Sequence, residues 1–313
     1  MKKFCITTAI AYVNAPPHVG FAYELILADA VAKWHKLKGE EVFFLTGTDE
    51  NAHKNAQAAK EAGIETKKFV NQNSKIFEEL CNRLNIIYND FIRTTEKRHV
   101  KIAQEIFKKV FDKGDIYKGF YEGYYCTGCE AFLTEKDLID GKCPEHNKEP
   151  SWLKEESYFF KLSKYYDKIL DLIKNSDFII PESKRNEIIK RLEKYGLKDL
   201  SVSRTKLDWG IDVPFDNNHK IYVWFDALIN YVSALGYPKD NKFKKYWPAD
   251  AHLIGKGINW FHSVIWPGIL FSAGIEQPKH IVVHGYLTVN GQKIGKSLGN
   301  VVDPISLIKK YGV

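Results

Sequence analysis

The 313-residue sequence predicts an α/β fold whose parallel sheet is interrupted by an inserted module. Near the N-terminus a β-prone run, an amphipathic segment and a second β-prone run follow one another within about 45 residues, which favours parallel strands joined by a helix. After Gly114 the chain becomes aromatic, rich in turns and Cys-bearing. From about Ile221 the α/β pattern resumes, so we expect a nucleotide-binding sheet built from both sides of an insertion.

The first helix is predicted at residues 21–39, between strands at 3–10 and 41–47. Its apolar residues recur at spacings of three and four, which predicts one apolar face. These residues are Tyr23, Ile26, Leu27, Ala30, Val31, Trp34 and Leu37. Gly39 is expected to end the helix.

Further helical segments are predicted at 52–63, 66–84 and 96–114, so that most of the chain from 52 to 112 is interpreted as helical. Residues 183–206 read as a basic helical region, with eight Lys or Arg against three Asp or Glu.

Composition restricts the class of protein. The net charge of +7 is a modest excess, compatible with a polyanionic partner. The sequence contains no run of about 18 apolar residues, so a membrane span is not expected. Pro16-Pro17 argue against a signal peptide. We therefore expect a cytoplasmic protein with no membrane partner.

Three of the five cysteines form a pattern with a histidine. Cys126 and Cys129 are followed, after thirteen residues, by Cys143 and His146. Three thiolates and one imidazole in two such pairs predict a tetrahedral Zn²⁺ site, and four protein ligands make it structural. The alternatives are unrelated free thiols, or a disulfide in an exported protein.

The junction between the first strand and the first helix reads "AIAYVNAPPHVGFAYE". Helix-start N–H groups suit a phosphate there, and Asn14, His18, Gly20 and Glu24 lie close together in sequence. Asp49 ends the next strand, where it could bind a substrate ammonium group. An ordinary loop histidine and a helix N-cap are the alternative interpretations.

The stretch "NGQKIGKSLGN" resembles the end of a P-loop but lacks its first glycine. Lys293 and Lys296 lie three residues apart among glycines, which predicts a mobile cationic loop that closes on a polyphosphate. A solvated lysine turn is the alternative.

Together the motifs resemble those of one family. "HVGF" and "KIGKS" are similar to the HIGH and KMSKS signatures of class I aminoacyl-tRNA synthetases. Further matching motifs, in the family's order, are "TGTDE", the Cys126–His146 pattern, "YFFKL", "LSVSR", "YVWFDALINYVSALGY", "HLIGKGINWFH" and "SLGNVVDP". The whole chain resembles the methionyl-tRNA synthetases.

The resemblance implies a Rossmann-like sheet of the class I synthetase type, split by a zinc-knuckle connective domain. It implies that methionine reacts with ATP and Mg²⁺ to give methionyl-adenylate, and that the methionyl group then moves to the acceptor end of tRNA(Met). The implied segments are 1–115 and 221–290 for the two halves of the catalytic domain, 116–220 for the insertion, and 291–313 for the KMSKS-type loop and the start of a helical region.

The resemblance also implies roles for single residues. The implied catalytic residues are His18, Lys293 and Lys296. The implied ATP-binding residues are Asn14, His18, Gly20, Glu24, Gly255, Lys293, Lys296 and Ser297. The implied methionine-binding residues are Ile10, Tyr12, Asp49, Arg204, Trp224, Tyr231, His262 and Trp266. Without the resemblance, the aromatic members of this set would be interpreted as core.

The sequence departs from the family pattern at several places. These are Phe21 for the second signature His, Asn51-Ala52 for "HG", Gly257 for the Asp of "GKD", Ile294 for the Met of KMSKS, and Gly295 for its Ser. The helical anticodon-binding part of the family is also not found in the sequence, so a missing or separate part is expected.

Two other functions are considered. One is a catalytically weakened, zinc-binding RNA-binding or assembly fragment of a split synthetase. The other is a class I synthetase for another apolar amino acid, which would be expected to carry a larger editing insertion.

Overall fold

The computed structural model describes residues 2–205, 207–289, 291–294 and 302–313. A seven-stranded sheet with the order β2-β3-β1-β13-β14-β8, in which β4 also pairs with β3, forms its centre. Every pairing in this sheet is parallel. The strands are β1 (Lys3–Thr8), β2 (Ala11–Tyr12), β3 (Glu41–Asp49), β4 (Asp90–Arg93), β8 (Ile179–Ile180), β13 (Ala251–Gly255) and β14 (Ile281–His284). The predicted parallel α/β sheet is therefore confirmed.

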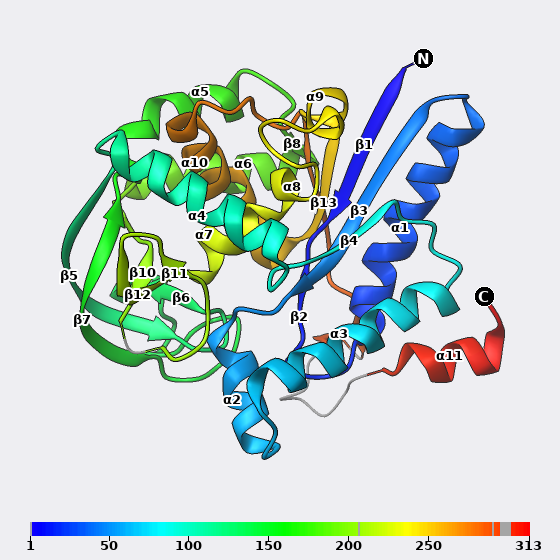
Figure 1. Cartoon of the computed structure of the whole chain (residues 1–313), viewed down its shortest axis with the longest axis horizontal. Coiled ribbons are helices and arrows are strands. Elements are labelled where there is room, and N and C mark those ends of the chain that lie inside the picture. Colours follow the sequence, from blue (N-terminus) through cyan, green and yellow to red (C-terminus); the bar gives the residue numbers. More distant parts are fainter. Residues whose placement is uncertain (1, 206, 290, 295–301) are drawn as a thin grey trace.

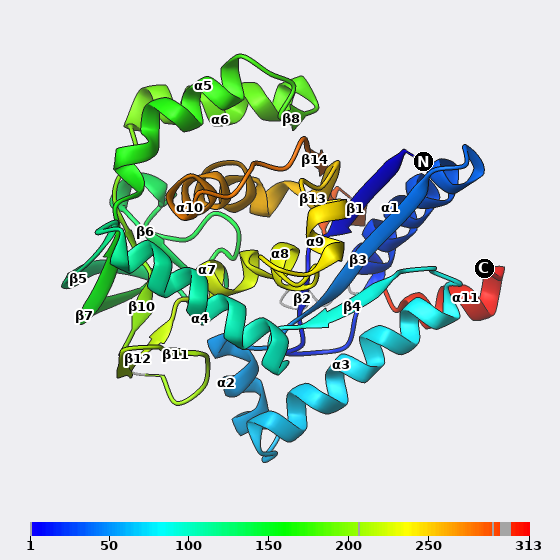
Figure 2. The ribbon, with the colours of Figure 1, turned by 45° about the horizontal axis from the view of Figure 1, so that its top comes forward.

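Helices cover both faces of the sheet, as Figures 1 and 2 show for α1 and α3 on one side and α4 and α10 on the other. Neighbouring strand residues point to opposite faces. Ile6 and Phe44 pack in the core under α1 and α3, whereas Cys5 and Phe43 pack in the core on the other face. The long apolar strands β1 and β3 are therefore buried on both sides, as parallel strands require.

The helices are α1 (Val19–Leu37), α2 (His53–Glu61), α3 (Thr66–Arg83), α4 (Lys97–Asp112), α5 (Tyr166–Lys174), α6 (Glu182–Tyr195), α7 (Val223–Leu228), α8 (Asn230–Ser233), α9 (Asn241–Tyr246), α10 (Trp266–Ala273) and α11 (Pro304–Tyr311). Short helical turns lie at Glu135–Asp137, Leu162–Tyr165, Lys256–Ile258 and, as a π-helical turn, Phe261–Ile265. No helix in the described ranges is both long and apolar enough to span a bilayer.

The region between the two halves of the parallel sheet carries antiparallel strands. One sheet has the order β6-β5-β7-β9 and another the order β10-β12-β11. The strands are β5 (Ile116–Cys126), β6 (Ala131–Leu133), β7 (Ser151–Phe160), β9 (Leu200–Ser201), β10 (Ser203–Arg204), β11 (Asp212–Val213) and β12 (Asp216–Ile221). A hairpin of β15 (Thr288–Val289) and β16 (Gln292–Lys293) follows the parallel sheet.

The division into segments at 116–220 stays a prediction, and the structure adds one feature to it. β8 lies inside that range but pairs with β14 at the edge of the parallel sheet. The helices that flank β8 in the sequence, α5 and α6, lie at the same end of the molecule in Figure 2.

The apolar face predicted for the first helix is wrong, because most of its residues do not pack against the sheet. Trp34 and Leu37 are 61% and 83% exposed, and Ile26 and Val31 are exposed as well. The buried apolar positions are instead Ala22, Leu25, Ala28 and Ala32, next to buried Glu24 and Asp29. Small side chains there let the helix approach the sheet closely, so size and not hydrophobicity decides which face packs.

Two further predictions need correction. The basic helix ends at Tyr195, where Gly196 has φ 65°, and the chain continues as β9 and β10. The predicted helical region from 52 to 112 also contains β4, whose four residues are too few to show a strand periodicity in the sequence. The end of the first helix at Gly39, with φ 77°, is confirmed.

Candidate active site

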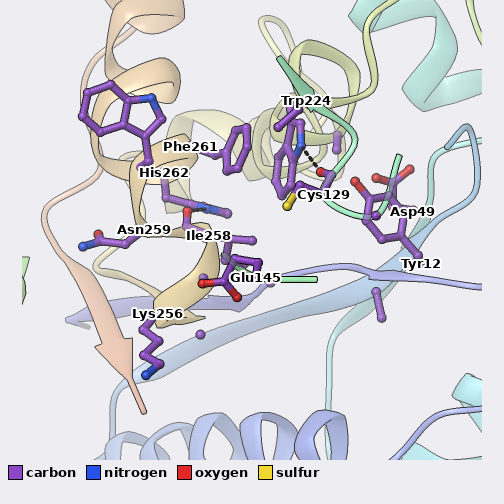
Figure 3. Close-up of a pocket in the computed structure, with 18 of the residues that line it drawn as sticks. Tyr12, Asp49, Cys129, Glu145, Trp224, Lys256, Ile258, Asn259, Phe261 and His262 are labelled. Atoms are coloured by element: carbon purple, nitrogen blue, oxygen red, sulfur yellow. Dashed lines mark hydrogen bonds between the residues drawn. The ribbon is translucent and has the colours of Figure 1, made fainter. Parts of the chain in front are cut away.

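A cavity of about 650 Å³ opens at the carboxyl ends of the parallel strands. This is where open α/β sheets bind their ligands. Its walls come from the loop after β1, the start of α1, the end of β3, the helices α7 and α8, the segment from Gly255 to His262 and the residues after β14. The loops that carry Cys129 and Cys143 close its remaining side (Figure 3).

Asp49 lies at one end of the cavity, beside Tyr12 (Figure 3). Its side chain is buried, with 3% of the residue exposed, and its Oδ1 atom has no hydrogen-bond partner. Burial, and then the charges of Asp226 and Glu130, raise the pKa of this carboxyl well above its usual value. A cation in the cavity would lower this pKa and so favour the ionised form of Asp49, because it would supply the missing partner.

Tyr12 contributes a second buried polar atom without a partner, its hydroxyl oxygen. The Lys54 Nζ atom lies 3.6 Å from the centre of the Tyr12 ring and donates a hydrogen bond to the Gly128 carbonyl. Burial lowers the pKa of Lys54. The Lys54 ammonium group is thus bound by the Gly128 carbonyl and the Tyr12 ring, and the Asp49 Oδ1 stays without a hydrogen-bond donor.

A slot with an aromatic wall lies next to Asp49, and the stacked rings of Trp224 and Phe261 form that wall. Trp224 stacks on Phe261 with ring centres 3.7 Å apart and planes 12° apart. The Trp224 Nε1 atom donates to the Cys129 carbonyl at 3.3 Å, the dashed line in Figure 3. Ile10 and Tyr231 also line the cavity. Such a slot suits a slender apolar side chain that contacts ring faces.

Phe261 was not predicted from the sequence, although its neighbour His262 was. The π-helical turn at Phe261–Ile265 lets both consecutive residues line the cavity. Widened turns of this kind often occur at functional sites. The "NWFH" segment gives no periodicity that would distinguish Phe261 from a core residue.

His262 is held as a neutral imidazole. Its Nδ1 donates to the Ile258 carbonyl at 3.0 Å, so its Nε2 accepts from the Tyr231 hydroxyl at 2.7 Å. Burial lowers the pKa of His262 to about 4. The cavity therefore presents no cation at this position near neutral pH, which suits an uncharged ligand group.

Acidification is expected to destabilise the fold through His262. Between pH 6.5 and its folded pKa of about 4, the unfolded chain binds a proton that the folded chain does not bind. The stability is therefore complete above pH 6.5 and falls as the pH drops, by about 2 kcal/mol between pH 7.5 and pH 5 for this group. Urea unfolding at these two pH values measures the loss.

His262→Gln is the matched variant for this measurement. It keeps a polar side chain but does not titrate, while buried His252, whose pKa burial also lowers, stays in place. The loss on acidification should shrink by about the same 2 kcal/mol. An equal loss in both chains would contradict the assignment.

The other end of the cavity begins at α1. His18 is the N-cap of this helix, and its Nδ1 accepts a hydrogen bond from the Gly20 N–H at 3.0 Å. No acidic residue lies in the first turn of α1. His18 and Gly20 both line the cavity, so a helix N-terminus faces it and offers an anion site.

Glu24 lies deeper in the same end. Its carboxylate accepts from the Ala9 N–H at 2.8 Å and from the His284 Nε2 at 2.9 Å. Burial raises the pKa of Glu24. Burial by itself would lower the pKa of His284, but the hydrogen bond to Glu24 and the charge of Glu24 raise it overall. Gly255 also lines this end. His284 was missed from the sequence, where it lies in the β-prone run "HIVVHGYLTV" and looks like a strand residue.

Some predicted residues do not line the cavity. Trp266 is fully buried and packs against Tyr231 and Trp247. Arg204 pairs with Glu155 and its guanidinium lies 4.4 Å from the centre of the Tyr125 ring. Neither Trp266 nor Arg204 is a lining residue of this cavity, and their assignment to the methionine site stays a prediction. Asn14 belongs to the loop before α1 and is also not a lining residue.

The predicted lysine loop is only partly described. Lys293 lies in β16, whereas Lys296 and Ser297, like Gly295, fall outside the described residues. Ile294 is buried and lines the cavity. Ile294 therefore brings the described part of this stretch to the cavity.

The four predicted metal ligands come together. Their ligand atoms all lie within 4.8 Å of one another. The His146 Nδ1 lies 3.3 Å from the Cys129 sulfur and 3.9 Å from those of Cys126 and Cys143. Ligands about 2.3 Å from a tetrahedral zinc ion would lie about 3.7 Å apart, so the set fits Zn²⁺. A Cβ on Gly128 would lie 2.6 Å from the His146 ring, which explains the glycine between the first two cysteines.

Comparisons with known proteins agree with this geometry. The family model described as "tRNA synthetases class I (M)" matches residues 4–151 and 136–313. The chain is 50% identical to the methionine--tRNA ligase of Thermotoga maritima, over 99% of this chain and 50% of that protein. It is 51% identical to that of Rickettsia bellii, over 100% of this chain and 62% of that protein. The chain thus spans about half to three fifths of the length of these relatives.

A solved structure is similar over the whole chain. It is the methionyl-tRNA synthetase of Mycobacterium tuberculosis in complex with methionyl-adenylate, with a TM-score of 0.96 and 46% identity. The match covers 100% of this chain and 62% of that one.

Proposed function

The chain belongs to the class I tRNA synthetases of the M group, and on that premise we propose that it activates methionine with ATP and charges tRNA(Met). The observation that carries this proposal is the buried Asp49 carboxylate, whose Oδ1 lacks a partner in a cavity that also holds the Trp224–Phe261 stack. An α-amino acid with a slender apolar side chain complements both features. The relatives named above bear the corresponding enzyme name.

Methionine binds with its ammonium group at Asp49 and the Tyr12 hydroxyl. Its thioether lies in the slot against the wall formed by the Trp224–Phe261 pair, where sulfur gains from aromatic contacts. Neutral His262, hydrogen-bonded to Tyr231, presents no charge that would have to be desolvated. A charged or branched amino acid side chain would leave this slot unfilled or would clash with it.

ATP binds across the other end of the cavity. Its phosphates lie at the α1 N-terminus near His18 and Gly20, and its ribose lies near Glu24 and Gly255. The methionine carboxylate attacks the α-phosphate and displaces pyrophosphate, without a covalent enzyme intermediate. Positioning and charge stabilisation supply most of the acceleration. Lys293, Lys296 and Ser297 are proposed to contact the phosphates, and Mg²⁺ would neutralise part of their charge.

The cluster of Cys126, Cys129, Cys143 and His146 would hold a structural Zn²⁺. Four protein donors leave no position for substrate. The ion's contribution is therefore to fix the two loops that form one wall of the cavity.

Transfer of the methionyl group to the 3′ end of tRNA would follow at the same site. A cytoplasmic location and a further anticodon-binding part stay predictions. The alternative is a zinc-binding RNA-binding or assembly fragment with weakened catalysis. It would not explain why the Asp49 Oδ1 is buried without a hydrogen-bond partner.

The experiment is ATP–pyrophosphate exchange with a panel of amino acids on the zinc-loaded chain. Exchange is expected with methionine, and at least tenfold less with leucine or isoleucine, since pocket fit distinguishes such side chains by about 1–3 kcal/mol. Exchange with leucine at the level of methionine would favour another synthetase of the class, and none with any amino acid would favour the fragment.

Phe261→Ala is expected to raise the KM for methionine about tenfold and to change the KM for ATP less than twofold. Removing the ring that stacks on Trp224 takes away part of the aromatic wall of the slot, a loss of about 1–2 kcal/mol. The exposed Phe120→Ala is the control, because its ring lies on the surface away from the cavity. A KM for methionine that stays within twofold in Phe261→Ala would contradict the slot.

A further inference from the structure

The end of the cavity near α1, where ATP is proposed to bind, is called the nucleotide-facing end. It contains an acidic side chain from the loop that carries Cys143 and His146, here called the metal loop. Glu145 lies between Cys143 and His146, and it lines the cavity together with Glu24, Gly255 and Lys256. Figure 3 shows its carboxylate pointing into the cavity beside Ile258 and Lys256. The loop thus supplies more than a wall, because it brings a carboxylate to the nucleotide side.

Tyr286 positions this carboxylate. Its hydroxyl donates to the Glu145 Oε2 at 3.2 Å. The Lys256 Nζ lies 4.6 Å from the centre of the Tyr286 ring. Three parts of the chain that are far apart in sequence therefore meet here: the metal loop, the segment after β13 and the segment after β14.

Gly257 makes this arrangement possible. A Cβ built on Gly257 would lie 2.0 Å from the Tyr286 hydroxyl oxygen and 3.7 Å from the Glu145 Oε2. Any side chain at this position would displace Tyr286. The sequence has glycine here where the family pattern has aspartate, so the space next to β13 is filled by Tyr286 and Glu145.

The chemistry of ATP limits what a carboxylate can do here. A carboxylate repels phosphate oxygens but accepts strong hydrogen bonds from hydroxyl groups. The ribose hydroxyls of ATP are such donors, and carboxylates bind ribose hydroxyls in other nucleotide-binding α/β folds. Glu145 lies in the part of the cavity that Gly255 and Glu24 also line, away from Asp49.

We propose that Glu145 accepts a hydrogen bond from a ribose hydroxyl of bound ATP, in the space that Gly257 leaves open. Tyr286 is its positioning residue. This inference rests on the proposed function for its ligand, but it assigns a nucleotide contact to a residue of the metal loop.

The test is calorimetric binding of ATP, 2′-deoxy-ATP and 3′-deoxy-ATP with Mg²⁺ and without amino acid, so that no reaction occurs. Glu145→Ala should weaken ATP binding about tenfold and should reduce the preference for ATP over at least one deoxy analogue by the same factor. Equal weakening for all three nucleotides, or none, would overturn the proposal. A changed Mg²⁺ requirement with an unchanged preference for ATP would overturn it too.

Two controls separate this contact from damage to the metal loop. Glu149→Ala changes an exposed carboxylate of the same loop that does not line the cavity, and it should bind ATP as the unmodified chain does. The zinc content of both variants should stay at one ion per chain. If Glu145→Ala loses zinc, Glu145→Gln, which keeps the size of the side chain, replaces it in the same test with a smaller expected loss.

Restoring a carboxylate at position 257 provides the rescue. In the Glu145→Ala chain, adding Gly257→Asp together with Tyr286→Phe removes the hydroxyl that would clash and supplies an aspartate. ATP binding and its preference over the deoxy analogue should return to within threefold of the original. Failure of the rescue would mean that position 257 and Glu145 do not serve the same contact. Exchange activity, measured separately, reports on the proposed function.

Discussion

Asp49→Asn is expected to lower kcat/KM for methionine in ATP–pyrophosphate exchange about 200- to 5,000-fold. The ammonium group of methionine would then be buried without a charged partner, and removing one member of a buried ion pair costs about 3–5 kcal/mol. The KM for ATP should change less than threefold, since Asp49 lies at the end of the cavity away from α1. Steady-state exchange kinetics with each substrate varied in turn measure both effects.

The same substitution should leave the fold at least as stable as before. In the ligand-free chain Asp49 is buried, its Oδ1 lacks a partner and burial raises its pKa well above the usual value, so ionising it at neutral pH opposes folding. A neutral amide removes this penalty. Asp90→Asn, at a carboxylate that pairs with Arg98 at the surface, is the control and should keep exchange within twofold. Full activity in Asp49→Asn would contradict the ammonium site.

Cys143→Ser is expected to remove the metal and to lower exchange at least 100-fold while the parallel sheet stays folded. The metal loops form one wall of the cavity. They also accept hydrogen bonds from the Trp224 Nε1, at the Cys129 carbonyl, and from the Tyr222 hydroxyl, at the Glu130 carbonyl. Without the ion these loops lose their fixed geometry, and the slot for the thioether loses its support.

Zinc analysis, far-UV circular dichroism and exchange on the same preparation measure this result. The control is Cys81→Ala, which changes a buried thiol outside the cluster and should keep one zinc ion per chain. Retention of both metal and activity in Cys143→Ser would refute the structural role of the cluster.

Much of the architecture could be predicted because it depends on local patterns. Gly39 marks the end of α1, and the apolar runs of β1 and β3 mark strands buried on both faces. The cysteine and histidine spacing predicted a cluster of four side chains that the fold then brings together. Each of these signals lies within a few residues of the feature that it determines.

The features that were missed depend on partners that are distant in sequence. The packing face of α1 is set by the closeness of the sheet, which favours Ala28 and Ala32 over Trp34. β8 pairs with β14, about one hundred residues further along the chain. Its two residues show no pattern of their own.

The cavity residues show the same limit of prediction from sequence. Asp49, Tyr12, Trp224 and His262 line the cavity as expected from their motifs. Trp266 has the same residue type as Trp224 but does not line the cavity, because it is fully buried against Tyr231 and Trp247. Phe261, His284 and Glu145 reach the cavity because of a π-helical turn, a strand end and a metal loop, none of which a residue pattern reveals.

The most direct test of the account is detection of methionyl-adenylate on the chain itself. The zinc-loaded protein is incubated with methionine and Mg-ATP, without tRNA and with pyrophosphatase, and is then analysed by native mass spectrometry. The account predicts about one methionyl-adenylate per chain, which disappears when Asp49 is replaced by Asn. A folded, zinc-loaded chain that binds methionine and ATP but forms no adenylate would contradict it.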